Sequence, residues 1–303
     1  MTETSHHRKK ELFSQGPRTA REDRRPPLSF SYKILIWCAL AASFVLGLSF
    51  LARAEGLQLT GVLVRGNSIV PSEEVAQVAE GHLEGFYGYL FPRRNSFLYP
   101  RESMREDLLS RFSRFLSVSI EKDDKRNLVI DVVERNLAYL LCDGEGFTAP
   151  CYGVDRTGYI FDSAPEFSGG IIFALKDERS LLAATSTPVG RVVLPEEELS
   201  RLLGIRDALR ETLRAHGAET TALGVRITQD SDYVLVLDTG EEHLELLFAE
   251  GDAATFASAL DLVLLTPQFE RKRVSLGLAA LRSIDLRFGK KVYYTFASTT
   301  PTE

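Results

Sequence analysis

The sequence LRSIDLRFGKKVYYTF occupies residues 281 to 296, close to the C-terminal end of the chain. Apolar and polar residues alternate on both sides of Gly289, with Ile284, Leu286 and Phe288 before it and Val292, Tyr294 and Phe296 after it. Alternation with a period of two predicts two strands joined by a turn. A strand this near the end of the chain has no following strand to cover it. We therefore expect an open sheet edge, whose unpaired backbone N–H and C=O groups can receive a strand from another chain.

The residues expected to touch such a partner are the polar and aromatic members of this segment. Backbone pairing would supply affinity, and aromatic side chains, which are favoured at interfaces, would supply selectivity. Successive side chains of a strand point to opposite faces, so these residues cannot all lie on one face. In an alternative interpretation the two charged residues discourage aggregation at the edge and the aromatic residues serve the sheet's own core. The candidate contact residues are Asp285, Arg287, Val292, Tyr293, Tyr294 and Phe296.

Composition favours a folded protein with a local membrane segment. The chain has 303 residues, of which 44% are hydrophobic and 26% charged, and a net charge of −6. Residues 1 to 33 carry eight Lys or Arg and four Asp or Glu, so the remainder carries 28 basic and 38 acidic residues. An acidic body argues against binding to the phosphate backbone of nucleic acid.

The N-terminal part predicts a disordered tail and one membrane span. Residues 1 to 33 lack apolar periodicity, and His6 and His7 in this tail lack the converging ligands of a metal site. Residues 34 to 52 contain no charge and would span roughly 28 Å as a helix, close to the thickness of a bilayer core. The basic residues before the span place the N-terminus in the cytoplasm and the rest of the chain outside the membrane. The alternative is a cleavable signal peptide, because Ala52-Arg53-Ala54 has the form of a cleavage site.

Residues 57 to 135 predict a first folded domain. A strand ending at the turn pair Gly66-Asn67 is followed by a helix beginning near Ser72, for which Ser72 is a candidate N-cap. Pro100 suits the first turn of a second helix, whose apolar stripe would include Phe112. Two strands follow, from 118 to 122 and from 128 to 134. The expected order is β-α-α-β-β.

Residues 136 to 297 predict a second, mixed α/β domain with a largely antiparallel sheet, and residues 298 to 303 a disordered C-terminus. Helices are expected after Pro195 and after Asp252, and strands recur between and after them. Cys142 and Cys151 bracket a short loop, and in an oxidising compartment we expect a structural disulfide rather than free thiols. The fold class is therefore α+β: a transmembrane helix, a β-α-α-β-β domain and this second domain.

Three short motifs, in this order and spacing, resemble the FtsQ/DivIB family of bacterial division proteins: VVERNLAYLL, VDRTGYIF and SIDLRFGKKVYY. The β-α-α-β-β unit after the span resembles the POTRA domain of that family. The resemblance implies a single-pass protein of the cell (inner) membrane at the division septum. It further implies a scaffold that binds FtsB-like and FtsL-like division proteins and helps recruit or regulate septal peptidoglycan synthesis.

The sequence contains no HExxH motif, nucleophile elbow or glycine-rich phosphate loop. We expect a non-enzyme without cofactor, metal or small-molecule substrate, and no nucleic-acid partner. One alternative is a POTRA-type chaperone or assembly factor in protein export, although such proteins usually repeat the unit. Another is a membrane-tethered cell-wall enzyme whose catalytic residues are scattered along the sequence.

Overall fold

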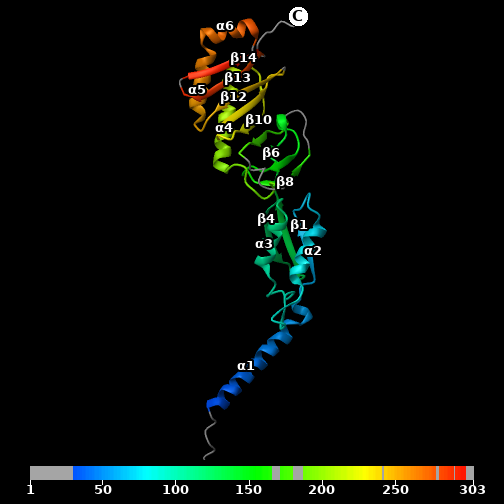
Figure 1. Cartoon of the computed structure of the whole chain (residues 1–303). Helices are drawn as coiled ribbons and strands as arrows, with labels where there is room; N and C mark the ends of the chain where they lie inside the picture. Colours follow the sequence, from blue (N-terminus) through cyan, green and yellow to red (C-terminus); the bar gives the residue numbers. More distant parts are fainter. Residues whose placement is uncertain are drawn as a thin grey trace, which may run out of the picture. The chain divides into compact units, whose positions relative to one another are not determined.

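The structure is a computed structural model, and it describes residues 30–165, 171–179, 187–240, 242–277, 280–289 and 291–297 (Figure 1). Most of the predicted tail, residues 1–29, and the predicted C-terminal end, residues 298–303, lie outside the described residues. The chain divides into two compact units, residues 1–52 and residues 53–303.

The first unit contains helix α1, Phe30–Ala52. Within it, Tyr32–Ala52 is the one segment in the described part of the chain that is long and apolar enough to cross a membrane. The helix continues without a break because its 23 residues contain no proline and include several alanines and leucines, which favour helix. The predicted apolar segment, residues 34 to 52, falls entirely within α1.

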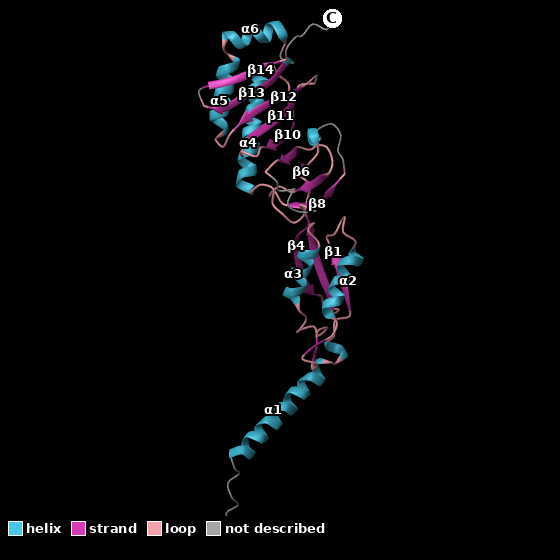
Figure 2. Cartoon of the chain, in the orientation of Figure 1, coloured by secondary structure: helices cyan, strands magenta, loops and turns pink. Residues whose placement is uncertain are grey.

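A small sheet of three strands, β1, β5 and β4 in spatial order, follows in the second unit (Figure 2). Strand β5 pairs in parallel with β1 and antiparallel with β4. The principal elements occur in the predicted order, with a short 3-10 helix and a short hairpin added. In chain order the elements are η1 (Glu55–Leu57), β1 (Gly61–Arg65), α2 (Ser72–Leu83), β2 (Phe86–Tyr87), β3 (Phe91–Pro92), α3 (Arg101–Arg111), β4 (Phe115–Lys122) and β5 (Asn127–Glu134).

The two helices bury an apolar face against this small sheet. Helix α2 buries Val75, Ala79 and Leu83, which recur every four residues and so lie on one face. Two expectations were wrong in detail. Ser72 is the first helical residue rather than the cap, since Pro71 occupies the N-cap without a side-chain hydrogen bond. Phe112 lies just beyond α3, because its φ of −109° and ψ of 83° are not helical.

A large sheet of nine strands contains the rest of the described strands, in the spatial order β14-β13-β12-β11-β10-β9-β6-β7-β8. Five neighbouring pairs are antiparallel, and the pairs β12/β13, β9/β10 and β6/β9 are parallel. The sheet is therefore mixed. Its strands are β6 (Tyr139–Cys142), β7 (Cys151–Val154), β8 (Ile160–Ala164), β9 (Ala174–Asp177), β10 (Thr221–Ile227), β11 (Tyr233–Asp238), β12 (His243–Phe248), β13 (Leu281–Phe288) and β14 (Lys291–Phe296).

Three longer helices and a 3-10 turn accompany the large sheet: η2 (Glu145–Phe147), α4 (Glu196–Ala215), α5 (Ala253–Leu264) and α6 (Pro267–Leu276). Helices α4 and α5 pack on the same face of the sheet (Figure 1). Asp252 caps α5 as expected, because its carboxylate accepts a hydrogen bond from the Thr255 N–H. Helix α6 was not predicted, although Thr266 caps it and Pro267 occupies its first turn.

Candidate partner-binding edge

Strand β14 lies at one edge of the large sheet, and β13 is its only strand partner in the described part of the chain. The predicted hairpin therefore places residues 291–296 where the sequence analysis expected an open edge. Asp285 and Tyr293 lie opposite each other in its register, as do Ile284 and Tyr294. Strand β14 contains no proline, so it can donate along its whole length.

The backbone groups that point away from β13 belong to alternate residues of β14. The N–H of Ala297 donates to the carbonyl of Ala280, at 2.7 Å, so Ala297 faces β13. Lateral direction alternates along a strand, and both irregularities of this hairpin lie on β13. The N–H and C=O groups of Val292, Tyr294 and Phe296 consequently point to the open edge.

The side chains of those same three residues turn toward the helices rather than toward solvent. Phe296 is 9% exposed and packs on Phe269 of α6, with ring centroids 5.5 Å apart. Tyr294 is half-buried and meets Phe269 edge to face at 5.2 Å. A partner could reach the buried Phe296 only through its backbone.

Tyr293 points to the opposite face. It is 58% exposed and forms an edge-to-face pair with the exposed Phe288, at a centroid distance of 5.5 Å. Among the predicted aromatic contacts, Tyr293 has the ring that is most open to a partner.

Asp285 and Arg287 form a fixed ionic cluster with Asp232. The Arg287 guanidinium donates to both Asp285 oxygens, at 2.9 and 2.6 Å, and to Asp232 Oδ2 at 2.9 Å. These hydrogen bonds hold the pKa of Asp285 below its usual value, and the two carboxylates raise the pKa of Arg287. Arg287 therefore ties β13 to the turn before β11, so a role in partner contact would compete with this internal pairing.

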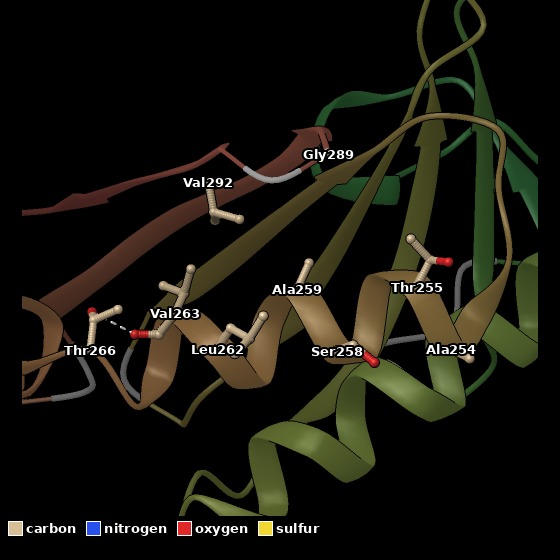
Figure 3. A pocket seen from close by; sticks show the side chains of 9 residues that line it. All are labelled: Ala254, Thr255, Ser258, Ala259, Leu262, Val263, Thr266, Gly289 and Val292. Atoms are coloured by element: carbon tan, nitrogen blue, oxygen red, sulfur yellow. Dashed lines mark hydrogen bonds between the residues drawn. The ribbon is translucent and has the colours of Figure 1, made fainter.

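An apolar groove runs beside the open edge, between α5 and the β13–β14 turn (Figure 3). Its volume is about 640 Å³. The α5 side carries small residues and one large exposed side chain, Leu262, which is 68% exposed. The lining residues are Ala254, Thr255, Ser258, Ala259, Leu262, Val263, Thr266, Gly289 and Val292.

Sequence analysis did not identify this groove, because its two walls are separated in the chain by α6. The available signal was the exposed side of α5, where small residues recur at helical spacing beside Leu262. That pattern becomes informative only when Val292 is placed opposite it.

The predicted cysteine pair lies far along the sheet from this edge. Cys142 and Cys151 occupy directly opposite positions of β6 and β7 and are joined by a disulfide. Both are buried, together with Leu140 and Ala174. Cys38 in α1 is exposed and unpaired.

The motif residues near the start of the large sheet have internal partners. The Glu134 carboxylate accepts hydrogen bonds from the backbone N–H groups of Ser68, Ile69 and Val70, at 2.9 to 3.1 Å. Burial raises the pKa of Glu134, but these hydrogen bonds outweigh it and leave the pKa lowered. Arg135 pairs with the buried Asp155.

Asp155 in turn organises the turn that follows it. Its Oδ1 atom accepts from the Thr157 N–H at 2.8 Å, the Thr157 hydroxyl at 2.6 Å and the Tyr159 N–H at 3.1 Å. Gly158 has a φ of 81°, and a Cβ atom there would lie 2.2 Å from the Leu194 carbonyl oxygen. The conformation therefore requires glycine.

In the described residues no three His, Cys, Asp or Glu side chains are placed to hold a metal ion. His82 pairs with Asp107 at 2.8 Å and His216 with Asp261 at 2.7 Å. His243 is exposed at the start of β12.

No protein-family model matches this chain, and no curated protein matches its sequence. Among solved structures it is similar to POTRA1-2 of the periplasmic domain of Omp85 from Anabaena, at 13% identity and a TM-score of 0.20. The match covers 61% of this chain and 96% of that one. A similarity this weak does not assign the chain to a family.

Proposed function

We propose that this protein is a bitopic membrane scaffold that binds the extracytoplasmic segment of another membrane protein by strand addition at β14. The observation that carries the proposal is the open edge itself. It combines outward-pointing N–H and C=O groups at Val292, Tyr294 and Phe296 with a strand that contains no proline. Such an edge is a template for an added strand.

The surroundings of the edge define what an added strand would meet. Alternate side chains of that strand would lie on the same face as Val292, above the groove beside α5. The other set would lie beside Tyr293 and Phe288. An apolar residue at alternate positions of the partner therefore suits this site, with the groove selecting its size.

The resemblance to the FtsQ/DivIB family supports a finer proposal. The protein acts in cell division, and the partners are FtsB-like and FtsL-like proteins at the septum. Binding them would recruit or regulate septal peptidoglycan synthesis, with no chemical step in this chain. Anchoring both partners in one membrane raises their effective concentration, so a modest interface suffices.

Two observations support the proposed topology. The basic residues before α1 favour a cytoplasmic N-terminus in a cell (inner) membrane. The disulfide between Cys142 and Cys151 suits an oxidising, extracytoplasmic compartment.

The test compares two substitutions at one position in the full-length protein, purified from gently solubilised membranes with whatever it binds. Val292→Pro removes an outward N–H and places a ring in the path of an added strand, whereas Val292→Ala trims the same side chain and keeps the N–H. We expect loss of co-purifying single-span proteins for Val292→Pro and retention for Val292→Ala. Equal recovery with both variants, each still folded, would remove β14 from the mechanism.

The identity of the recovered proteins distinguishes the alternative function. Small single-span division proteins support the scaffold in cell division. Export substrates or outer-membrane barrels, lost with Val292→Pro in the same way, would instead support a POTRA-type chaperone or assembly factor that uses the same edge.

A further inference from the structure

A second exposed apolar surface lies in the small-sheet part, in residues 85–98, which we call the aromatic hairpin. It contains β2 and β3 and the loop after them. Tyr89 is 92% exposed, Phe97 74% and Phe86 50%. The core of the small sheet is complete without these three rings. Large aromatic rings in open positions therefore need an explanation other than folding.

Cationic side chains accompany the rings of the aromatic hairpin. The Arg53 guanidinium carbon lies 5.4 Å from the Phe86 ring centroid, and Lys122 Nζ lies 4.8 Å from that of Phe97. Arg93 lies 5.4 Å from the ring of Tyr87. Residues 85 to 98 contain no aspartate or glutamate. The surface thus combines amphipathic rings with positive charge.

The aromatic hairpin contacts the residue that is covalently joined to the end of α1. Arg53 directly follows Ala52, the last residue of α1. Its Nη2 atom donates to the carbonyls of Tyr89 and Leu90 in the hairpin tip, at 3.2 and 3.3 Å. The hairpin tip is therefore within hydrogen-bonding distance of the side chain of the residue that directly follows the apolar segment.

We propose that the aromatic hairpin lies in the phospholipid headgroup layer of the bilayer that contains α1. The proposal rests on the membrane anchoring in the proposed function and adds a lipid contact to it. Tyrosine and other aromatic rings are enriched at this depth, and arginine and lysine attract the lipid phosphates. The hairpin would thereby fix the height of the folded part above the membrane.

Lipid fits the surface better than a protein partner does. The rings are spread over the hairpin and the loop after it rather than gathered around a cavity, and cations stack on Phe86, Tyr87 and Phe97. A layer of anionic phosphates above an apolar interior matches both properties at once. Arg53, which contacts the hairpin tip, directly follows the span, so no further binding event is needed to bring the surface near that layer.

The experiment measures depth with an environment-sensitive fluorophore on the full-length protein in nanodiscs. The background variant carries Cys38→Ser, and one cysteine is then introduced as Tyr89→Cys or, as the control, as Ile69→Cys. Ile69 is 64% exposed, and its N–H donates to Glu134, the last residue of β5. Arg126 lies at the opposite end of β5, where its side chain contacts Glu55 and Gln58. Both sites are open, but they lie at opposite ends of the small sheet.

Lipids that carry a quencher on the headgroup are expected to reduce the emission of the label at position 89 to roughly half, and to leave position 69 nearly unchanged. Adding Phe86→Ser and Phe97→Ser should raise the emission at position 89 again, whereas Phe288→Ser on the large sheet should not. Equal, weak quenching at both positions would overturn the proposal. Failure of the chain to remain in the nanodisc would instead refute the membrane anchoring itself, and so the proposed function.

Discussion

At the scale of single residues, the three motifs that carry the family resemblance act within the fold. Glu134 binds the backbone of the loop after β1, Arg135 pairs with Asp155, and Arg287 pairs with Asp232 and Asp285. Each motif holds a turn or a strand to its neighbour. We infer that these residues stabilise the fold rather than contact a partner.

Asp155→Asn tests this interpretation. Burial raises the pKa of Asp155, but the Thr157 hydroxyl, the Arg135 guanidinium and two backbone N–H groups outweigh it and leave the pKa lowered. A carboxylate with a lowered folded-state pKa stabilises the fold above its unfolded value of 3.8 and loses that contribution as pH falls through the folded value. We expect the variant to lose about 2 kcal/mol of unfolding free energy at pH 7.

The difference between Asp155→Asn and the original protein should shrink as pH falls below 3.8, because the original carboxylate becomes protonated. Urea unfolding followed by circular dichroism at several pH values measures both effects. A difference that stays constant with pH would show that charge at Asp155 is not the cause. Asp162→Asn, which alters the partly exposed pair with Arg114, is the control and should change stability less, because Asp162 is more exposed than the buried Asp155.

At the scale of elements, helix α5 has two roles. One face packs Phe256, Leu260 and Leu264 into the core of the large sheet, and the other lines the groove beside β14. The start of α5 is set by Asp252, whose side chain accepts from the N–H and the hydroxyl of Thr255. The position of the groove wall therefore depends on this cap.

Asp252→Ala is expected to lower the unfolding free energy, since the first turn of α5 loses its acceptor. Asp252→Asn keeps an acceptor and should lose only a fraction of that amount. Chemical denaturation of the two variants measures the difference. Equal stability of both variants and the original protein would mean that the cap does not stabilise α5.

Leu262→Asp tests the groove itself. A charge in the groove would oppose an apolar side chain from an added strand, so we expect at least about a tenfold loss of partner affinity. Leu265→Asp is the matched control, because Leu265 is 64% exposed next to the same helix but does not line the groove. If both variants bind equally well in a quantitative pull-down, the groove takes no part in recognition.

At the scale of the whole molecule, the small and large sheets bury separate apolar clusters. The small-sheet cluster contains residues from Leu59 to Val132, and the large-sheet cluster contains residues from Leu141 to Phe296. The disulfide lies in a third, smaller cluster beside β6 and β7. A local change in the large sheet should therefore leave the small sheet folded.

Replacing both Cys142 and Cys151 by alanine is expected to destabilise the large sheet by about 2.5 to 3 kcal/mol, on the chain-entropy estimate for so short a loop. Hydrogen exchange should accelerate at amides of β6 and β7 and remain unchanged at amides of β5. Faster exchange in β5 to the same degree would show that the two sheets unfold together. Reduction of the original protein should reproduce the pattern.

Much of this fold could be predicted from local sequence patterns. Period-two alternation located β13 and β14, and helical spacing located α2, α4 and α5. The parallel pairing of β9 with β6 and of β12 with β13 could not be predicted, because it depends on contacts between distant segments. At the candidate edge, alternation showed that Tyr293 and Tyr294 lie on opposite faces. Which face is buried was decided by Phe269, in the helix that sequence analysis missed.

The order of strands in the large sheet places the open edge at β14 far from β6, the first strand of the sheet along the chain. The chain enters through β6 and reaches β14 six strand spacings later, a separation of about 29 Å at roughly 4.8 Å for each spacing. A rotation of about 10° around β6 would therefore carry the open edge by about 5 Å. The ion pairs of Arg135 with Asp155 and of Arg114 with Asp162 lie beside β7 and β8, near the axis of such a rotation. A small rotation at these ion pairs would therefore move the open edge by several times the distance that it moves the paired side chains.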